Sequence, residues 1–239
     1  MGKGYVWYAC EIMTTIANNL QGIHSRIENA CQRSGRNPAS VALLAVSKTF
    51  GVDAVVQAHA AGQTAFGENY IQEAVEKITT LRELPLQWHC IGPIQSNKTR
   101  LVAGYFDWLH TLDRLKIAQR LSEQRPAHLA PLQVCIQVNV DGGPTKSGVA
   151  PAEALALAQA VSVLPGLRLR GLMCIPEPAP DFVAGCAVFS RAKALFDVLN
   201  QEGMGLDTLS MGMSDDLEAA IASGSTMVRV GSAIFGARR

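Results

Sequence analysis

A lysine stands where an apolar run of the chain ends. The run 41–47 (VALLAVS) is almost wholly aliphatic, and Lys48 and Thr49 follow it directly. Such a run is typical of a strand that is covered on both faces. An ammonium group at the end of this strand would be partly desolvated, which lowers the pKa of the lysine and makes its amine a nucleophile toward aldehydes. On position alone, an ordinary surface lysine would be the better interpretation.

Residues near the end of the sequence are suited to an anion. The run 226–231 (TMVRVG) leads into Gly231 and Ser232, which open a short helical turn. Backbone N–H groups at the start of a helix favour a phosphate. Ser214 can donate a hydrogen bond to the same anion, or cap the helix that follows it. Together with Lys48, these residues predict a phosphorylated aldehyde bound as a Schiff base.

Arg229 is the one charged residue within the run 226–231. A charge inside a strand is costly unless it is paired. A guanidinium beside a pyridine nitrogen would keep that nitrogen unprotonated, because like charges repel. The alternative is a structural ion pair with an acid such as Asp215. We favour the role toward a ligand.

These residues require elements that bring the two ends of the chain together. Short β-rich runs alternate with helical runs along all 239 residues. We expect strands at 41–47, 64–67, 86–92, 106–110, 132–140, 167–173, 207–212 and 226–231. We expect helices at 52–61, 70–84, 95–104, 113–124, 151–163, 181–201 and 214–223. Eight β-α units of this size predict a single (β/α)8 TIM barrel, and no strand is followed by the GxGxxG of a dinucleotide-binding sheet. The first and last strands of a closed barrel are neighbours, so Lys48 and Ser232 can face one ligand.

The composition excludes several classes of protein. The chain has a formal net charge of +1, 17% charged residues and 48% hydrophobic residues, so disorder is not expected. The near-zero charge gives no reason to expect a nucleic acid or an anionic membrane surface as partner, and we interpret the basic-aromatic stretch 96–108 as an ordinary helix face. The six cysteines form no CxxC pair, which favours free thiols in a reducing cytosol over a zinc site or a disulfide scaffold.

The N-terminal dozen residues have little of a targeting signal. Glu11 interrupts their short apolar stretch, no run approaches the length of a membrane span, and apolar residues from Ile16 onward recur at helical spacing. We expect residues 1–12 to be an extension and residues 13–239 to be the folded domain. An ordered N-terminal turn is the alternative.

Six motifs in order carry a family resemblance. They are LLAVSKTF (43–50), FGENYIQEAVEKI (66–78), WHCIGPIQSNKTRLV (88–102), TKSG (145–148), GLMCIP (171–176) and the segment 209–238. From about residue 14 onward the chain closely resembles the pyridoxal phosphate homeostasis protein family, which is similar to the barrel domain of alanine racemase. The sequence departs from many relatives in having Thr49 and Phe50 after the lysine, where a proline is common.

The resemblance implies roles for nine residues toward pyridoxal 5′-phosphate (PLP). Lys48 would hold the cofactor as a Schiff base and Arg229 would face the pyridine nitrogen. The phosphate would lie against Ser214, Gly231 and Ser232, with Ser210 and Met211 on the same wall. Asn69 and His89 would lie near the ring, unless Asn69 caps the following helix and His89 is a satisfied core histidine. Lys146, in the loop after the fifth strand, is interpreted as a solvated lysine rather than a second phosphate contact.

Three functions are compatible with these residues. The first is a PLP-binding homeostasis protein of the cytosol that stores or delivers the cofactor as a monomer, in transient contact with apo PLP enzymes. The second is a PLP-dependent racemase, which needs two acid-base groups on opposite faces of the substrate. The resemblance implies that alanine racemase takes the second group from another domain, for which this length leaves no room. The third is a class I aldolase, which would have no need of Arg229. We favour the first, without an evident catalytic activity.

Overall fold

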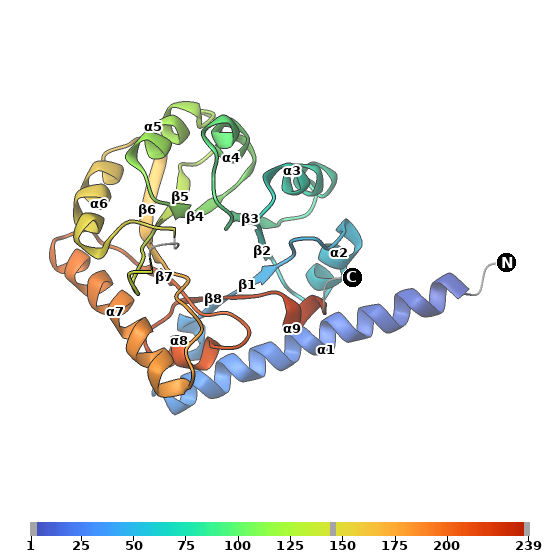
Figure 1. Cartoon of the computed structure of the whole chain (residues 1–239). Helices are drawn as coiled ribbons and strands as arrows, with labels where there is room; N and C mark the ends of the chain where they lie inside the picture. Colours follow the sequence, from blue (N-terminus) through green and yellow to red (C-terminus); the bar gives the residue numbers. More distant parts are fainter. Residues whose placement is uncertain (1–3, 144–146, 237–239) are drawn as a thin grey trace.

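The computed structural model describes residues 4–143 and 147–236, with side chains from residue 15 onward. Eight parallel strands form one closed barrel in the order β1 to β8, and helices surround it (Figure 1). The strands are β1 (Ala42–Val46), β2 (Ala65–Glu68), β3 (Gln87–Cys90), β4 (Trp108–Leu112), β5 (Leu132–Gln137), β6 (Leu167–Met173), β7 (Thr208–Ser210) and β8 (Met227–Val230). The α-helices are α1 (Gly4–Arg33), α2 (Val52–Ala60), α3 (Ile71–Thr80), α4 (Thr99–Tyr105), α5 (Leu115–Gln124), α6 (Ala154–Ser162), α7 (Phe182–Gln201), α8 (Leu217–Ala222) and α9 (Ser232–Phe235). The predicted (β/α)8 barrel is confirmed.

Helix α1 lies across one side of the barrel. Its apolar residues Ile16, Leu20, Ile23 and Ile27 are all buried, because their three- and four-residue spacing places them on one helical face. The helix packs against α8, α9 and α2, and its N-terminal end projects beyond the barrel (Figure 1). It runs from Gly4 without a break, so the division at residues 12 and 13 stays a prediction.

Successive side chains of each strand point to opposite faces of the sheet. One set is buried between the sheet and the helices, and the other points into the barrel. Val228 and Val230 belong to the large apolar core between sheet and helices, whereas Arg229 between them faces the inside of the barrel. The barrel interior holds a small separate apolar cluster that includes Trp108 and Cys135. Buried polar side chains also lie inside the barrel, among them His89, His110 and Arg229.

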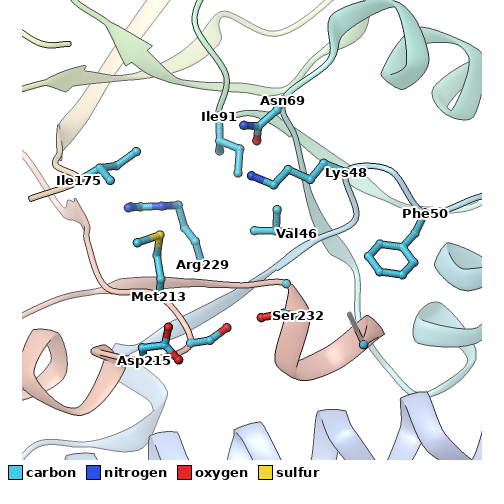
Figure 2. Close-up of a pocket in the computed structure, with 13 residues that line it drawn as sticks. Val46, Lys48, Phe50, Asn69, Ile91, Ile175, Met213, Asp215, Arg229 and Ser232 are labelled. Atoms are coloured by element: carbon cyan, nitrogen blue, oxygen red, sulfur yellow. The ribbon is translucent and has the colours of Figure 1, made fainter. Parts of the chain in front are cut away.

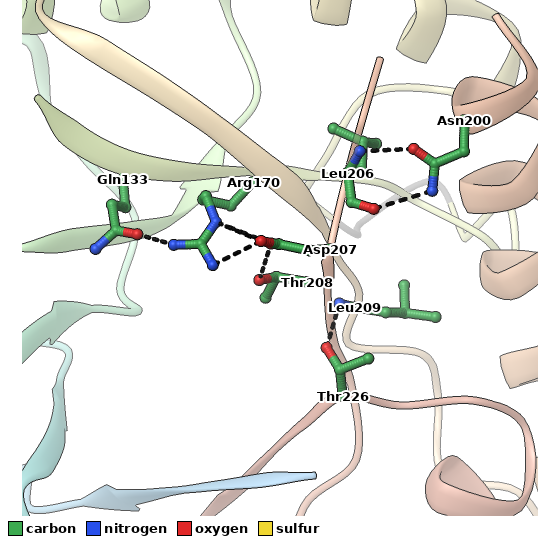
Figure 3. A network of polar contacts seen from close by, with 8 residues as sticks. All are labelled: Gln133, Arg170, Asn200, Leu206, Asp207, Thr208, Leu209 and Thr226. Atoms are coloured by element: carbon green, nitrogen blue, oxygen red, sulfur yellow. Dashed lines mark hydrogen bonds and ion pairs between the residues drawn. The ribbon is translucent and has the colours of Figure 1, made fainter. Parts of the chain in front are cut away.

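The amino-terminal end of the barrel is closed by an arginine. Figure 3 shows Arg170 between Gln133 and Asp207, and its guanidinium donates hydrogen bonds to both side chains. The guanidinium also lies over the ring of Trp108, 4.7 Å from the centroid. Gly171 follows in the same strand. A Cβ there would meet the carbonyl oxygen of Thr208 at 1.6 Å, so only glycine allows β6 and β7 to pair at this point.

Several predicted element bounds differ from the structure by two to four residues; the helix expected at 70–84, for example, ends at Thr80. The fourth strand was expected at 106–110, and β4 is Trp108–Leu112. The fifth was expected to continue to residue 140, and β5 ends at Gln137, after which the chain makes only an isolated bridge from Val138 to Val149. In the part of the chain that the structure describes, no helix is long and apolar enough to span a bilayer.

Candidate functional site

A cavity of about 250 Å³ opens at the carboxyl ends of the strands (Figure 2). This is the end of a (β/α)8 barrel at which ligands bind. The loops after β1, β2, β3, β6, β7 and β8 all contribute to it. The lining residues are Val46, Lys48, Phe50, Asn69, Ile91, Ile175, Met213, Ser214, Asp215, Arg229, Gly231, Ser232 and Gly236.

The loop after β1 presents Lys48 to the cavity in a tightly held turn. The Lys48 side chain points into the cavity beside Asn69 and Ile91 (Figure 2). Thr49, the next residue, has a φ of 68°, a left-handed conformation that is strained for a β-branched side chain. Its amide nitrogen donates to Glu73 Oε1 at 3.0 Å. Helix α3 therefore holds the strained residue that follows the lysine.

A cluster of three buried residues, Ser47, Glu68 and Lys77, together with the partly exposed Glu73, supports this turn from below. Lys77 Nζ lies 2.8 Å from Glu68 Oε1 and 2.6 Å from Glu73 Oε1, and it donates to the carbonyl oxygen of Ser47 at 3.0 Å. The Ser47 hydroxyl donates to Glu68 Oε1 at 2.6 Å. Burial raises the pKa of Glu68, although the positive charge of Lys77 acts to lower it. The cluster thus fixes both residues that flank Lys48.

Arg229 forms part of the cavity wall and is almost fully buried, with 4% of its surface exposed. Its Nη1 donates to Ser210 Oγ at 2.8 Å and its Nη2 to the carbonyl oxygen of Cys174 at 3.0 Å. These contacts replace the ion pair with Asp215 that was the alternative. Burial acts to lower the pKa of Arg229, but a guanidinium keeps its proton in proteins. The cavity therefore contains a fixed positive charge.

The residues predicted to hold a phosphate gather beside Lys48. Ser214, Gly231 and Ser232 all line the cavity, and α9 begins at Ser232. The backbone at Gly231 passes close to β1, since a Cβ there would lie 3.1 Å from the carbonyl oxygen of Val46. Arg26 of α1 donates to the carbonyl oxygen of Ser214 at 2.9 Å, so α1 holds this loop in place.

Asn69 contributes a buried polar atom to the site. Among the residues that the structure describes, its Oδ1 has no hydrogen-bond partner. The loop after β3 fixes the backbone of Asn69, because a Cβ on Gly92 would lie 2.3 Å from the Asn69 carbonyl oxygen. A buried polar atom without a partner is costly, and one that lines a cavity is suited to a ligand.

Three of the nine predicted site residues do not line this cavity. His89, Ser210 and Met211 are fully buried beneath or beside it. His89 is a core histidine, which was the alternative that the sequence left open. Both of its ring nitrogens lie within hydrogen-bonding distance of protein partners. Burial lowers its pKa to about 3. Lys146 lies outside the described residues.

This chain is similar to known proteins in both sequence and fold. The family model for the alanine racemase N-terminal domain matches residues 18–239. A protein of Pseudomonas aeruginosa with the name pyridoxal phosphate homeostasis protein is 62% identical over 95% of this chain and 97% of its own. Its namesake in Escherichia coli K12 is 54% identical over 95% and 98%. The chain belongs to the pyridoxal phosphate homeostasis protein family.

Solved structures support this membership. The family member PipY of Synechococcus elongatus, solved with PLP bound, has a TM-score of 0.80 and 36% identity over 92% of this chain and all of its own. An alanine racemase of Corynebacterium glutamicum, at 19% identity and a TM-score of 0.67, shares the fold; the present chain covers 62% of it.

The apolar part of the cavity was not predicted from the sequence. Ile91, Ile175 and Met213 stand one to three residues beyond the ends of their strands, where a barrel places its ligand. Once the strands were assigned, that position was the available signal. The ring of Phe50, which also lines the cavity, lies 5.2 Å from that of Phe235.

Proposed function

We propose that this protein binds PLP in the cavity, with Lys48 as its covalent anchor. The observation that carries the proposal is the convergence of Lys48, the Arg229 charge and Asn69 on one cavity at the carboxyl end of the barrel, where the buried Asn69 Oδ1 has no partner among the described residues. The name of the close relatives and the PLP in PipY support it.

The residues present fit each part of the cofactor. The amine of Lys48 and the aldehyde would condense to a Schiff base with release of water. Gly231 and Ser232 would hold the phosphate with backbone N–H groups at the start of α9, with Ser214 beside them. Arg229 would face the pyridine nitrogen and keep it unprotonated, so the ring would be a weak electron sink.

A PLP ring that withdraws electrons only weakly is better suited to storage of the cofactor than to catalysis with it. We infer that the protein holds and releases PLP in the cytosol, as a monomer that contacts apo PLP enzymes only transiently, and that it has no catalytic activity of its own. Racemase activity is the second candidate, since the fold is shared with alanine racemase.

Absorbance tests the binding. Wild-type protein titrated with PLP should give the spectrum of a protein-bound imine, and Lys48→Ala should not. Lys98→Ala is the matched control, because Lys98 lines a neighbouring hollow that also includes Asn69. An imine spectrum that survives in Lys48→Ala but is lost in Lys98→Ala would reverse the assignment.

Transfer and turnover tests separate the two candidate functions. Holoprotein mixed with an apo PLP enzyme should restore that enzyme faster than free PLP at the same concentration. If holoprotein restored the activity of the apo enzyme no faster than free PLP does, this would count against delivery. Incubation with L- and D-alanine should give no racemisation at ordinary enzyme rates, about 1 s⁻¹ or more, and turnover at such rates would favour the racemase.

A further inference from the structure

A continuous chain of hydrogen bonds runs through the inside of the barrel from the cavity to its opposite end. Beyond Arg229 and Ser210, it continues from Ser210 Oγ to His110 Nδ1 at 2.9 Å, from His110 Nε2 to His89 Nδ1 at 2.9 Å, and from His89 Nε2 to Gln87 Oε1 at 3.0 Å. The proposed contacts with PLP use only the first member, Arg229. The other four residues come from β3, β4 and β7.

The chemistry of the two ends sets the direction of every hydrogen bond. Arg229 can only donate, so the Ser210 oxygen accepts from it. Gln87 Oε1 can only accept, so His89 Nε2 carries a hydrogen and the Nδ1 of neutral His89 does not. His110 Nε2 must then donate to His89, which leaves the Nδ1 of neutral His110 to accept the Ser210 hydroxyl hydrogen. All four bonds point from Arg229 toward Gln87.

The surroundings keep both imidazoles neutral, as this order requires. His89 and His110 are both fully buried, and Trp108 stacks on His89 with ring centroids 5.2 Å apart. Burial lowers the pKa of His110 well below its usual value, and the positive charge of Arg229 lowers it further. Protonation would also give His110 two donors and remove the acceptor for Ser210.

We propose that His110 and His89 are positioning residues that hold Arg229 in place through Ser210. Because the Ser210 hydrogen is committed to His110, its oxygen lone pairs are turned toward the guanidinium. The Cys174 carbonyl oxygen fixes the other arm of Arg229. The guanidinium is therefore set before a ligand arrives. This role rests on the proposed binding of PLP, with Arg229 facing the ring.

The proton order can be measured on the protein without ligand. The chain has five histidines, so nitrogen NMR of selectively ¹⁵N-histidine-labelled protein can resolve them, with His89→Gln used for assignment. We expect both His89 and His110 to carry hydrogen on Nε2 and none on Nδ1. A hydrogen on Nδ1 of His110 would overturn the proposed direction whether or not PLP binds.

The effect on Arg229 is tested by a double-mutant cycle on PLP affinity. His110→Leu and Ser210→Ala should each weaken binding about 10-fold, and the double variant should be no weaker than either single variant. His110→Asn should retain more affinity than His110→Leu, since its side-chain oxygen can still accept from Ser210. Additive effects, or unchanged affinity in His110→Leu, would overturn the positioning role.

A control separates positioning from damage to the core. Leu112→Ala, on the same strand, removes a fully buried side chain of the outer core and should lower stability while leaving PLP affinity unchanged. If Leu112→Ala lost as much PLP affinity as His110→Leu, the role of His110 would be structural only. Failure of the wild type to bind PLP would instead overturn the proposed function. The NMR experiment would still test the proton order, because it uses the protein without ligand.

Discussion

Lys48 and Arg229 reach the same cavity from neighbouring strands, but their supports differ in kind. Beneath Lys48 lies the charged cluster of Lys77, Glu68 and Glu73, which grips the backbone on both sides of the lysine. Beneath Arg229 lies a neutral chain in which Ser210 contacts the guanidinium and His110 and His89 lie behind Ser210. The residue proposed to react thus keeps its side chain exposed to the cavity, whereas the residue that supplies fixed charge is immobilised.

The largest expected effect comes from the charged cluster. Lys77→Met leaves the buried Glu68 without its positively charged partner, and should lower the free energy of unfolding by about 3–5 kcal/mol. Denaturant unfolding measures this change. Lys116→Met, at an exposed position of α5, is the matched control and should stay within about 0.5 kcal/mol of wild type.

A double variant tests whether the loss comes from the uncompensated charge. Adding Glu68→Gln to Lys77→Met removes the buried carboxylate and should recover part of the lost stability. If the double variant were no more stable than Lys77→Met, the ion pair would not be the source of the effect, and the contrast between the two supports would weaken.

The neutral chain predicts a pH effect of intermediate size. The pKa of His89 is about 3 in the folded protein against 6.5 in the unfolded chain, so the unfolded chain binds more protons between these values. The unfolding free energy should therefore fall as pH is lowered, by ~2 kcal/mol from pH 7 to pH 5 through His89. The difference in stability between wild type and His89→Gln should change by this amount. A pH-independent difference would mean that His89 titrates alike in both states.

The charged cluster should give a pH dependence of opposite sign. Burial raises the pKa of Glu68 in the folded protein, so the folded chain retains a proton that the unfolded chain has lost just above the usual carboxyl range. This contribution falls as pH rises through that range. As pH rises, the unfolding free energy of wild type should therefore fall relative to that of Glu68→Gln. It should rise relative to that of His89→Gln. Parallel curves of unfolding free energy against pH would contradict the comparison.

The smallest effect concerns the strained turn after Lys48. Thr49→Gly removes the cost of a β-branched residue at a φ of 68° and should raise the unfolding free energy by about 1 kcal/mol. Thr49→Val keeps the branch and should not stabilise. If both variants behaved alike, backbone strain at this position would not contribute.

The barrel and its two cations could be predicted, whereas their supports could not. Apolar runs that alternate with helical periodicity gave the eight units, and Lys48 and Arg229 were each conspicuous as a charge at or inside an apolar run. Lys77 looks like any lysine of an amphipathic helix, and only the fold buries it against Glu68. His110 was taken for the last residue of a strand at 106–110. Its true place in the middle of β4, and its contact with Ser210 a hundred residues later, depend on strand register.

Chemical fixation shows directly whether Lys48 anchors PLP. Wild-type protein loaded with PLP is reduced with borohydride, digested and mapped by mass spectrometry. We expect one pyridoxyl phosphate group per chain, on the peptide that contains Lys48. A label on Lys77, Lys98 or any other lysine, with the Lys48 peptide unmodified, would contradict it.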